Sequence, residues 1–246
     1  MGYHSIIYIF LFLPVCLFVY QLAPEKWRGR VLLGFSWIFF YLLSGKLLVY
    51  LLGTTLLTHC VGIWLTVIRM QEAKAVEGLE RKQKKAVKME YQKKGRRVLA
   101  LGIFILLGIL GYLKYFDFFT VNLSHLFGHP VLEGWSPENL LMTIGISFYT
   151  LQAIGYMTDV YWGTIQAETE IWRTALFLGF FPQIMEGPIA RYSDVADTLY
   201  TGKPLEYRNV VDGYVRIFWG LFKKMVIADR MALMVNQVFD LSLIHI

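Results

Sequence analysis

Long apolar runs alternate with short polar segments along the first two thirds of the chain. A bilayer core of about 30 Å needs roughly 20 apolar residues in a helix, so a run of that length predicts a membrane span. Such runs cover residues 5–23, 47–68, 98–118 and 140–158, and a shorter one covers 31–45. The shorter run predicts an oblique or partly re-entrant helix, and Pro14 predicts a kink in the first span.

The apolar pattern is interrupted after residue 158. Residues 174–185 are apolar but too few to cross a bilayer, and Pro182 and the triplet Glu-Gly-Pro at 186–188 end the run. Irregular backbone at membrane depth is tolerated only where it lines a cavity, so this run predicts a re-entrant segment. Residues 207–238 predict an interfacial or bundle-packed helix, because cations recur along an apolar sequence.

The composition excludes an ordinary soluble domain. Hydrophobic residues make up 56% of the 246 residues and charged residues only 17%, against about 25% charged in soluble domains. Cys16 and Cys60 both lie in apolar runs, which argues against a disulfide framework and a cysteine zinc site. We therefore expect an all-α polytopic membrane protein.

Positive charge is concentrated in residues 69–97, between the third and fourth runs. This segment holds eleven Lys and Arg against four Glu, a local net charge of +7. Lys26, Arg28 and Arg30 lie between the first two runs. Cations mark the cytoplasmic side, so both segments are expected there, with the N-terminus outside the cytoplasm. Residues 69–97 could also bind anionic lipid, but a solvated, topology-setting helix or linker is the favoured reading.

Polar side chains in the run 140–158 and just beyond it are candidates for a substrate path. Gln152, Tyr156 and Asp159 follow at i, i+4 and i+7, which predicts a narrow polar stripe on one helix face. Such a stripe could line a tunnel, or it could join helices by hydrogen bonds. Asp159 and Glu186 either face a cavity or lie at the membrane boundary, where a carboxylate costs little.

The positions of the histidines indicate neither a metal centre nor a catalytic base. His125 and His129 have i, i+4 spacing, but Gly128 and Pro130 interrupt the helix that a zinc site would need. His59 stands alone in an apolar run and is expected to be a packed or hydrogen-bonded core residue. No phosphate-binding loop, dinucleotide motif or GxSxG elbow is present.

Three segments resemble the membrane-bound O-acyltransferase family. They read GISFYTLQAIGYMTDVYWG at 145–163, FFPQIMEGPIARY at 180–192 and GLFKKMVIADRMA at 220–232. The branch most similar to them is that of the alginate O-acetyltransferases, and the D-alanyl transfer proteins of teichoic acid modification are more distant. Residues 5–17 and 111–119 resemble the same branch in the same order. The resemblance extends over nearly the whole chain, to about Phe239.

The resemblance implies a fold, a reaction and a location. The fold is a ring of transmembrane and re-entrant helices around a tunnel, of which residues 1–240 would form the N-terminal part. The reaction moves an acyl group, expected to be acetyl, from a cytoplasmic thioester to a hydroxyl of an extracytoplasmic cell-envelope polysaccharide or exopolysaccharide. The donor is acetyl-CoA or an acyl carrier thioester, with no bound cofactor or metal. The location is the bacterial inner membrane, with an esterase-like periplasmic protein as a possible partner and no nucleic acid. The expected tunnel-lining residues are Ser147, Tyr149, Gln152, Tyr156, Asp159, Gln183, Pro188 and Arg191.

The chain departs from the family in its histidines. The family's catalytic histidine, which acts as general base on the acceptor hydroxyl, lies in a Trp-Arg-Arg-Trp-His stretch that this chain does not contain. We therefore expect no catalytic residue within 246 residues and no activity from this piece alone. Residues 241–246, LSLIHI, match the translation of a transposon-end adapter, so the native frame is expected to be interrupted near Asp240. Trp162 and Glu186 stand where relatives commonly have Arg and Ala.

Two other functions remain open from the sequence. A transporter or flippase of lipid-linked or acylated sugars could use the same polar stripe as its path. A non-catalytic membrane scaffold could recruit a periplasmic transferase. Substrate-dependent flux favours the first alternative, and a complete gene that lacks the histidine favours the second.

Overall fold

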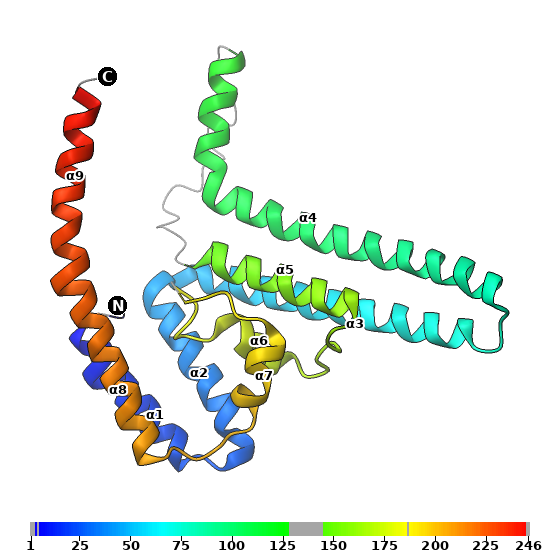
Figure 1. The fold of residues 1–246 in the computed structure, drawn as a ribbon, viewed down its shortest axis with the longest axis horizontal. Helices are drawn as coiled ribbons and strands as arrows, with labels where there is room; N and C mark the ends of the chain where they lie inside the picture. Colours follow the sequence, from blue (N-terminus) through cyan, green and yellow to red (C-terminus); the bar gives the residue numbers. More distant parts are fainter. Residues whose placement is uncertain (1–2, 4, 128–144, 186, 245–246) are drawn as a thin grey trace. The chain divides into compact units, whose positions relative to one another are not determined.

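The structure is a computed structural model that describes residues 3, 5–127, 145–185 and 187–244. Within those residues the chain forms helices and irregular connections and no strand, as the sequence predicts. The chain divides into two units, Leu22–Gly202 and the pair of segments Gly2–Gln21 and Lys203–Ile246. Figure 1 labels the helices of the two units.

The larger unit is organised around one long helix, α3. Its elements are α2 (Glu25–Ser44), the 3-10 turn η2 (Gly45–Leu47), α3 (Leu48–Val76), α4 (Arg81–Phe127), α5 (Ile146–Trp162), α6 (Ile171–Gly179) and α7 (Tyr192–Tyr200). Helix α3 packs against α4, α5 and α6, and α2 packs against α6. Figure 1 shows α3, α4 and α5 side by side. The main buried cluster lies between these helices and includes Leu65, Leu106, Met157 and Phe177.

Two helical stretches in the described part are long and apolar enough to cross a membrane. They are Glu25–Val76, which joins α2 and α3, and Arg81–Phe116 within α4. Helix α2 corrects the predicted run 31–45, because it begins six residues earlier, at Glu25. Pro24 has extended backbone angles and Glu25 is in the first turn, an arrangement that favours a helix start. Lys26, Arg28 and Arg30 are therefore helical rather than in a loop.

The basic segment 69–97 is mostly helical. It covers the end of α3, a short turn after Val76, and the first part of α4 from Arg81. Lys, Glu, Gln and Ala are strong helix formers, so the two apolar helices continue into the polar segment without a break. Residues 69–97 thus form a helical hairpin, which we call the basic hairpin.

The interrupted apolar sequence after α5 forms a short helix and a turn. Residues 140–144 of the predicted run 140–158 lie outside the described part, and α5 begins after Gly145. The predicted segment 174–185 divides into the second half of α6 and a turn after it. Phe181 and Ile184 in this turn are buried. Pro182 limits helix propagation because it lacks a backbone N–H, which agrees with the predicted break.

The smaller unit consists of helices whose side chains are largely exposed. Its elements are η1 (Tyr8–Phe12), α1 (Leu13–Leu22), α8 (Tyr207–Phe222), η3 (Lys223–Ala228) and α9 (Asp229–Ile244). The π-helical turn η1 ends at Phe12, two residues before Pro14, and the Leu13 N–H donates to the Tyr8 carbonyl. A π-turn is a local widening of the helix, and the kink expected at Pro14 stays a prediction. Helices α8 to α9 match the predicted helix 207–238 and extend it.

Candidate functional site

A cavity of about 300 Å³ lies between α5 and the segment that leads into α7. Its α5 wall contains the polar stripe predicted from sequence, Gln152, Tyr156 and Asp159. The opposite wall is the segment from Ile189 to Tyr192, which includes Arg191. We call this hollow the polar cavity. Figure 1 locates α5 and α7 in the larger unit.

Helix α5 carries the stripe in its last turns. Gly163 ends the helix just beyond Asp159, the last residue of the stripe. The Gly163 N–H donates to the carbonyls of Asp159, at 2.9 Å, and Val160, at 3.0 Å. Its φ of +76° lies in the left-handed region that glycine adopts without strain. A Cβ at this position would lie 1.3 Å from Nη1 of Arg69. The helix end and the Arg69 guanidinium therefore both depend on the absence of a side chain at residue 163.

Arg191 reaches the polar cavity because the chain before α7 is extended. Pro188 precedes it in a non-helical stretch, and Arg191 itself has φ −77° and ψ 144° immediately before the first residue of α7. Asp159 and Arg191 line the same cavity, yet no salt bridge joins them among the residues that the structure describes. The described lining of the cavity thus contains a carboxylate and a guanidinium that are not paired with each other.

The buried side of the polar cavity is held by a hydrogen-bond network centred on Glu168. The Tyr156 hydroxyl accepts a hydrogen bond from the Glu168 backbone N–H at 2.8 Å. The Tyr192 hydroxyl donates to Glu168 Oε1, and Arg173 Nη1 lies 3.5 Å from Glu168 Oε2. The Tyr200 hydroxyl donates to the Arg173 carbonyl at 2.7 Å. These contacts fix the two tyrosines that form the cavity's inner wall.

Tyr192 is a permanent proton donor in this network. Burial, and next the hydrogen bond to the Glu168 carboxylate, raise the pKa of the Tyr192 hydroxyl far above its usual value. A carboxylate beside a phenol disfavours the phenolate, since the two negative charges would repel each other. Tyr192 therefore stays protonated throughout the physiological range and serves to position Glu168.

His59 is a hydrogen-bonded core residue, as the sequence predicts. Its side chain in α3 is buried, and Nδ1 lies 3.2 Å from Oγ1 of Thr174 in α6. Neither residue lines the polar cavity. The contact joins two helices, which is the common role of polar groups between membrane helices.

The structure brings together four of the eight predicted tunnel residues. Gln152, Tyr156, Asp159 and Arg191 line the polar cavity. Gln152 also donates from Nε2 to the Phe177 carbonyl at 2.9 Å, so it joins α5 to α6 as well. Both readings of the stripe, a polar lining and a link between helices, therefore apply to this residue.

The other four predicted residues lie outside the polar cavity. Ser147 accepts a hydrogen bond from Lys114 Nζ at 3.0 Å. Tyr149 is buried against Phe40, with ring centroids 6.3 Å apart. Ser147 and Asp159 are separated by about 18 Å along the axis of α5 at 1.5 Å per residue, too far for one small site.

Gln183 and Pro188 belong to the turn that follows α6. The Gly187 N–H donates to the Gln183 carbonyl at 3.0 Å, and a Cβ at Gly187 would lie 2.6 Å from Gln183 Cα. Gln183 is therefore part of a tight turn, and Pro188 is exposed beside it. Glu186, predicted to face a cavity or the boundary, lies outside the described residues.

The described lining of the polar cavity offers no strong base or nucleophile. It provides a carboxylate, a guanidinium, an amide and two phenols, and no histidine, serine or cysteine belongs to it. The hydroxyl of Thr158 is engaged with the Ile154 carbonyl at 2.7 Å. In the described ranges no three His, Cys, Asp or Glu side chains gather where they could hold a metal ion.

The sequence interpretation missed Glu168, Arg173 and Tyr192. Glu168 and Arg173 lie between predicted elements, in a stretch whose hydropathy is unremarkable. One sequence feature could have indicated these residues. Gly163 follows a helix, and a glycine there marks a turn that folds the following residues back against the helix.

Comparison with known proteins identifies relatives over nearly the whole chain. The probable alginate O-acetylases of Pseudomonas aeruginosa and Pseudomonas putida are 29% and 30% identical to it over 242 residues, 98% of the chain. The peptidoglycan O-acetyltransferase of Helicobacter pylori is 30% identical over 168 residues, 58% of the chain and 31% of that protein. No family model matches the chain, and no solved structure matches it.

The chain spans less than half the length of the alginate O-acetylases, 42% and 46% of the two Pseudomonas proteins. The relatives nevertheless align with the apolar helices, the polar cavity and α8 to α9, since the match covers 98% of the chain. All the relatives named above are O-acetylating proteins by name. The chain is similar over nearly its whole length to the alginate O-acetylases, which agrees with the resemblance of its sequence to the membrane-bound O-acyltransferase family.

Proposed function

We propose that the chain is part of a membrane enzyme that O-acetylates a cell-envelope polysaccharide or exopolysaccharide. The observation that supports this most is the similarity, over 98% of the chain, to proteins named for O-acetylation of alginate. The relative that modifies peptidoglycan by name has the same type of reaction on a different glycan. The proposed acceptor is therefore a sugar hydroxyl, and the proposed acyl group is acetyl.

The proposed arrangement places donor and acceptor on opposite sides of the inner membrane. The basic hairpin faces the cytoplasm under the positive-inside rule, and the N-terminus lies outside. Acetyl-CoA or an acyl carrier thioester supplies the acetyl group from the cytoplasm. We propose an esterase-like periplasmic protein as a partner that works beside the enzyme on the same polysaccharide.

In this proposal the polar cavity forms part of the wall of the substrate path. Asp159 and Arg191 provide hydrogen-bond acceptors and donors for the polar atoms of a passing substrate. The transfer requires a base that takes the hydroxyl proton while the hydroxyl oxygen attacks the thioester carbonyl, the C–S bond breaks and the donor leaves as its thiol. The family resemblance assigns that role to a histidine beyond residue 246. The 246-residue chain by itself is expected to produce no ester.

The test is carried out in cells that make alginate but have lost their own O-acetylase. The protein is expressed from its complete reading frame, and acetyl esters released from the purified polysaccharide by mild alkali are measured. The proposal predicts acetyl esters above the level of cells with an empty vector. An unchanged ester content for alginate and also for peptidoglycan, with the protein present in the membrane, would overturn it.

The 246-residue chain serves as a second arm of the same experiment. It is expected to accumulate in the membrane and to leave the ester content at the level of the empty vector. Ester formation by this chain alone would contradict the placement of the base beyond residue 246. That result would leave the O-acetylation itself supported, so the two claims are tested separately.

A further inference from the structure

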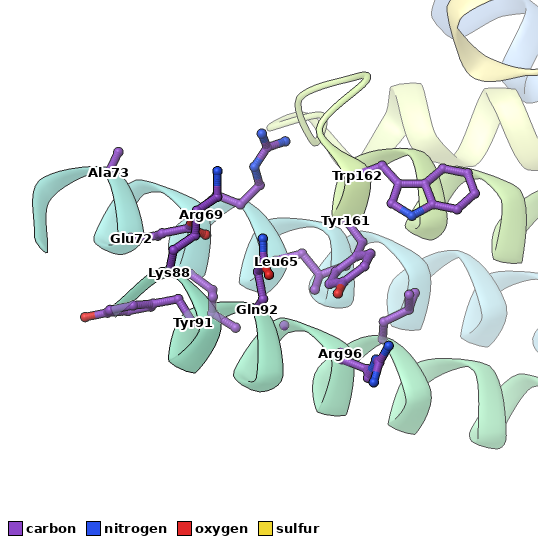
Figure 2. A pocket seen from close by; sticks show the side chains of 13 residues that line it. Leu65, Arg69, Glu72, Ala73, Lys88, Tyr91, Gln92, Arg96, Tyr161 and Trp162 are labelled. Carbon is purple, nitrogen blue, oxygen red and sulfur yellow. The ribbon is translucent and has the colours of Figure 1, made fainter. Parts of the chain in front are cut away.

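A second cavity, of about 600 Å³, lies between α3, α4 and the end of α5. Figure 2 shows its lining side chains, with Arg69 and Glu72 from α3, Lys88 and Arg96 from α4, and Trp162 from α5. All three helices belong to the larger unit. We call this hollow the basic cavity, and it lies on the basic hairpin.

The basic cavity has positive charge without matching negative charge. Its lining contains three cations, Arg69, Lys88 and Arg96, and one carboxylate, Glu72. Within the described part of the chain none of these three cations forms a salt bridge. Like charges held around one hollow repel each other, and an anion between them relieves that repulsion.

The walls of the basic cavity combine charge with apolar and aromatic surface. Leu65 and Ile68 are buried beside it, and Trp162 is 70% exposed at its edge. The cavity is also the place where α3 and α4 change from apolar to charged sequence. Aromatic rings and cations at such a boundary are typical of the membrane interface, where the headgroups of lipids lie.

One side of the basic cavity is fixed before any ligand binds. The Arg69 guanidinium lies against Gly163, where a Cβ would be 1.3 Å from Nη1. The ring of Tyr161 lies close to Gly95, where a Cβ would be 3.2 Å from Cε2. Gly95 and Gly163 thus let α4 and the end of α5 approach the same hollow, so a ligand need not order them.

We propose that the basic cavity binds the phosphate group of an anionic phospholipid from the cytoplasmic leaflet. The cations would contact the phosphate, and the exposed ring of Trp162 would contact the glycerol and the upper acyl chains. Basic pockets between membrane helices on the cytoplasmic side are suited to this chemistry. A soluble phosphate compound would use the cations but would leave the exposed ring of Trp162 without an apolar partner. This site is independent of the acetylation proposed above.

The test compares lipid binding by three forms of the protein, each made from the complete reading frame and purified in uncharged detergent. The first is unchanged. The second has Arg69→Gln, Lys88→Gln and Arg96→Gln, which remove the cations of the basic cavity. The third has Lys82→Gln, Lys93→Gln and Arg97→Gln, which remove the same charge from exposed positions of α4 outside the cavity. Native mass spectrometry counts bound phosphatidylglycerol and phosphatidylcholine, and thermal unfolding in detergent verifies that each form is folded.

The proposal predicts that phosphatidylglycerol binds the unchanged protein in preference to phosphatidylcholine. The cavity variant should bind it at least ~10-fold more weakly, since each interfacial cation contributes about 1 kcal/mol. The control variant should lose no more than about 3-fold, because its exposed cations lie outside the cavity and attract the lipid only through screened solvent. Equal losses in both variants would show only diffuse attraction and would overturn the proposal.

A further arm separates the lipid from a soluble source of phosphate. Acetyl-CoA and inorganic phosphate are added in place of the lipid, and binding is measured in the same three forms. The proposal predicts no change in their binding between the cavity variant and the control. Loss of acetyl-CoA binding in the cavity variant, with phosphatidylglycerol binding unchanged, would assign the cavity to the soluble donor and reject the lipid.

Discussion

Gly163 and Arg69 determine how the end of α5 meets the basic hairpin. The glycine has a positive φ, and the guanidinium occupies the space where a Cβ would be. Two separate costs therefore oppose a side chain at residue 163. One is the left-handed backbone, and the other is displacement of Arg69.

Gly163→Ala is expected to destabilise the protein by about 2 kcal/mol. Thermal unfolding in detergent measures the effect. Adding Arg69→Ala should recover part of the loss, because only the backbone cost then remains. Gly155→Ala in the same helix is the control, since nothing lies within 4 Å of a Cβ there. A loss in Gly155→Ala as large as in Gly163→Ala would contradict this account.

Tyr192→Phe removes the hydroxyl that donates to Glu168. The carboxylate keeps Arg173 but loses a hydrogen bond in a half-buried place, so the expected loss of stability is about 1–3 kcal/mol below pH 9. Because the pKa of Tyr192 is raised in the folded state, its stabilising effect is complete below the unfolded pKa of about 10 and declines as the pH rises above it.

The difference in melting temperature between the unchanged protein and Tyr192→Phe should therefore shrink from about pH 9 to about pH 11. Tyr207→Phe is the control, since its side chain belongs to the smaller unit and is 85% exposed. A difference that stays constant or grows with pH would show that the hydroxyl does not act through a protonated donor.

At the scale of elements, the sequence predicts helices better than their ends. Apolar content alone indicates α3 and α4, because a bilayer span requires it. The start of α2 at Glu25 was missed, since the cations Lys26 to Arg30 look like a loop when only hydropathy is considered. The helical form of the basic hairpin was left open for the same reason.

The residues of the polar cavity show which contacts the sequence pattern predicts and which it does not. The i, i+4, i+7 stripe correctly groups Gln152, Tyr156 and Asp159, because helical periodicity determines which residues share a face. Arg191 comes to the same hollow through the fold of the segment between α6 and α7. Glu168 and Tyr192 meet through a contact between distant residues, for which no local pattern exists.

The cavity between α5 and the segment before α7 can be tested by its effect on activity. Asp159→Asn and Arg191→Gln, each made in the complete protein, should reduce acetyl transfer at least ~10-fold, because each removes a charged contact for the substrate. Stability should change little, since no salt bridge joins the two side chains within the described residues. Asp197→Asn, an exposed change on α7, is the control. Full activity in both cavity variants would exclude the cavity from the substrate path.

For the whole molecule, the exposed apolar surface is the dominant feature. Large hydrophobic side chains such as Phe104, Trp219 and Phe239 are more than half exposed. Patches of this kind in a monomer indicate a membrane or protein partner. Together with the two helical stretches long enough to cross a bilayer, this surface indicates that lipid surrounds much of the chain.

The most direct test of the central claim follows the acetyl group itself. Inverted membrane vesicles that contain the protein from its complete reading frame are given radiolabelled acetyl-CoA outside and polysaccharide inside. The account predicts label on the polysaccharide that mild alkali releases as acetate, and none in vesicles without the protein. Polysaccharide that stays unlabelled while the protein is present and folded, or that crosses the membrane without gaining an ester, would contradict the account.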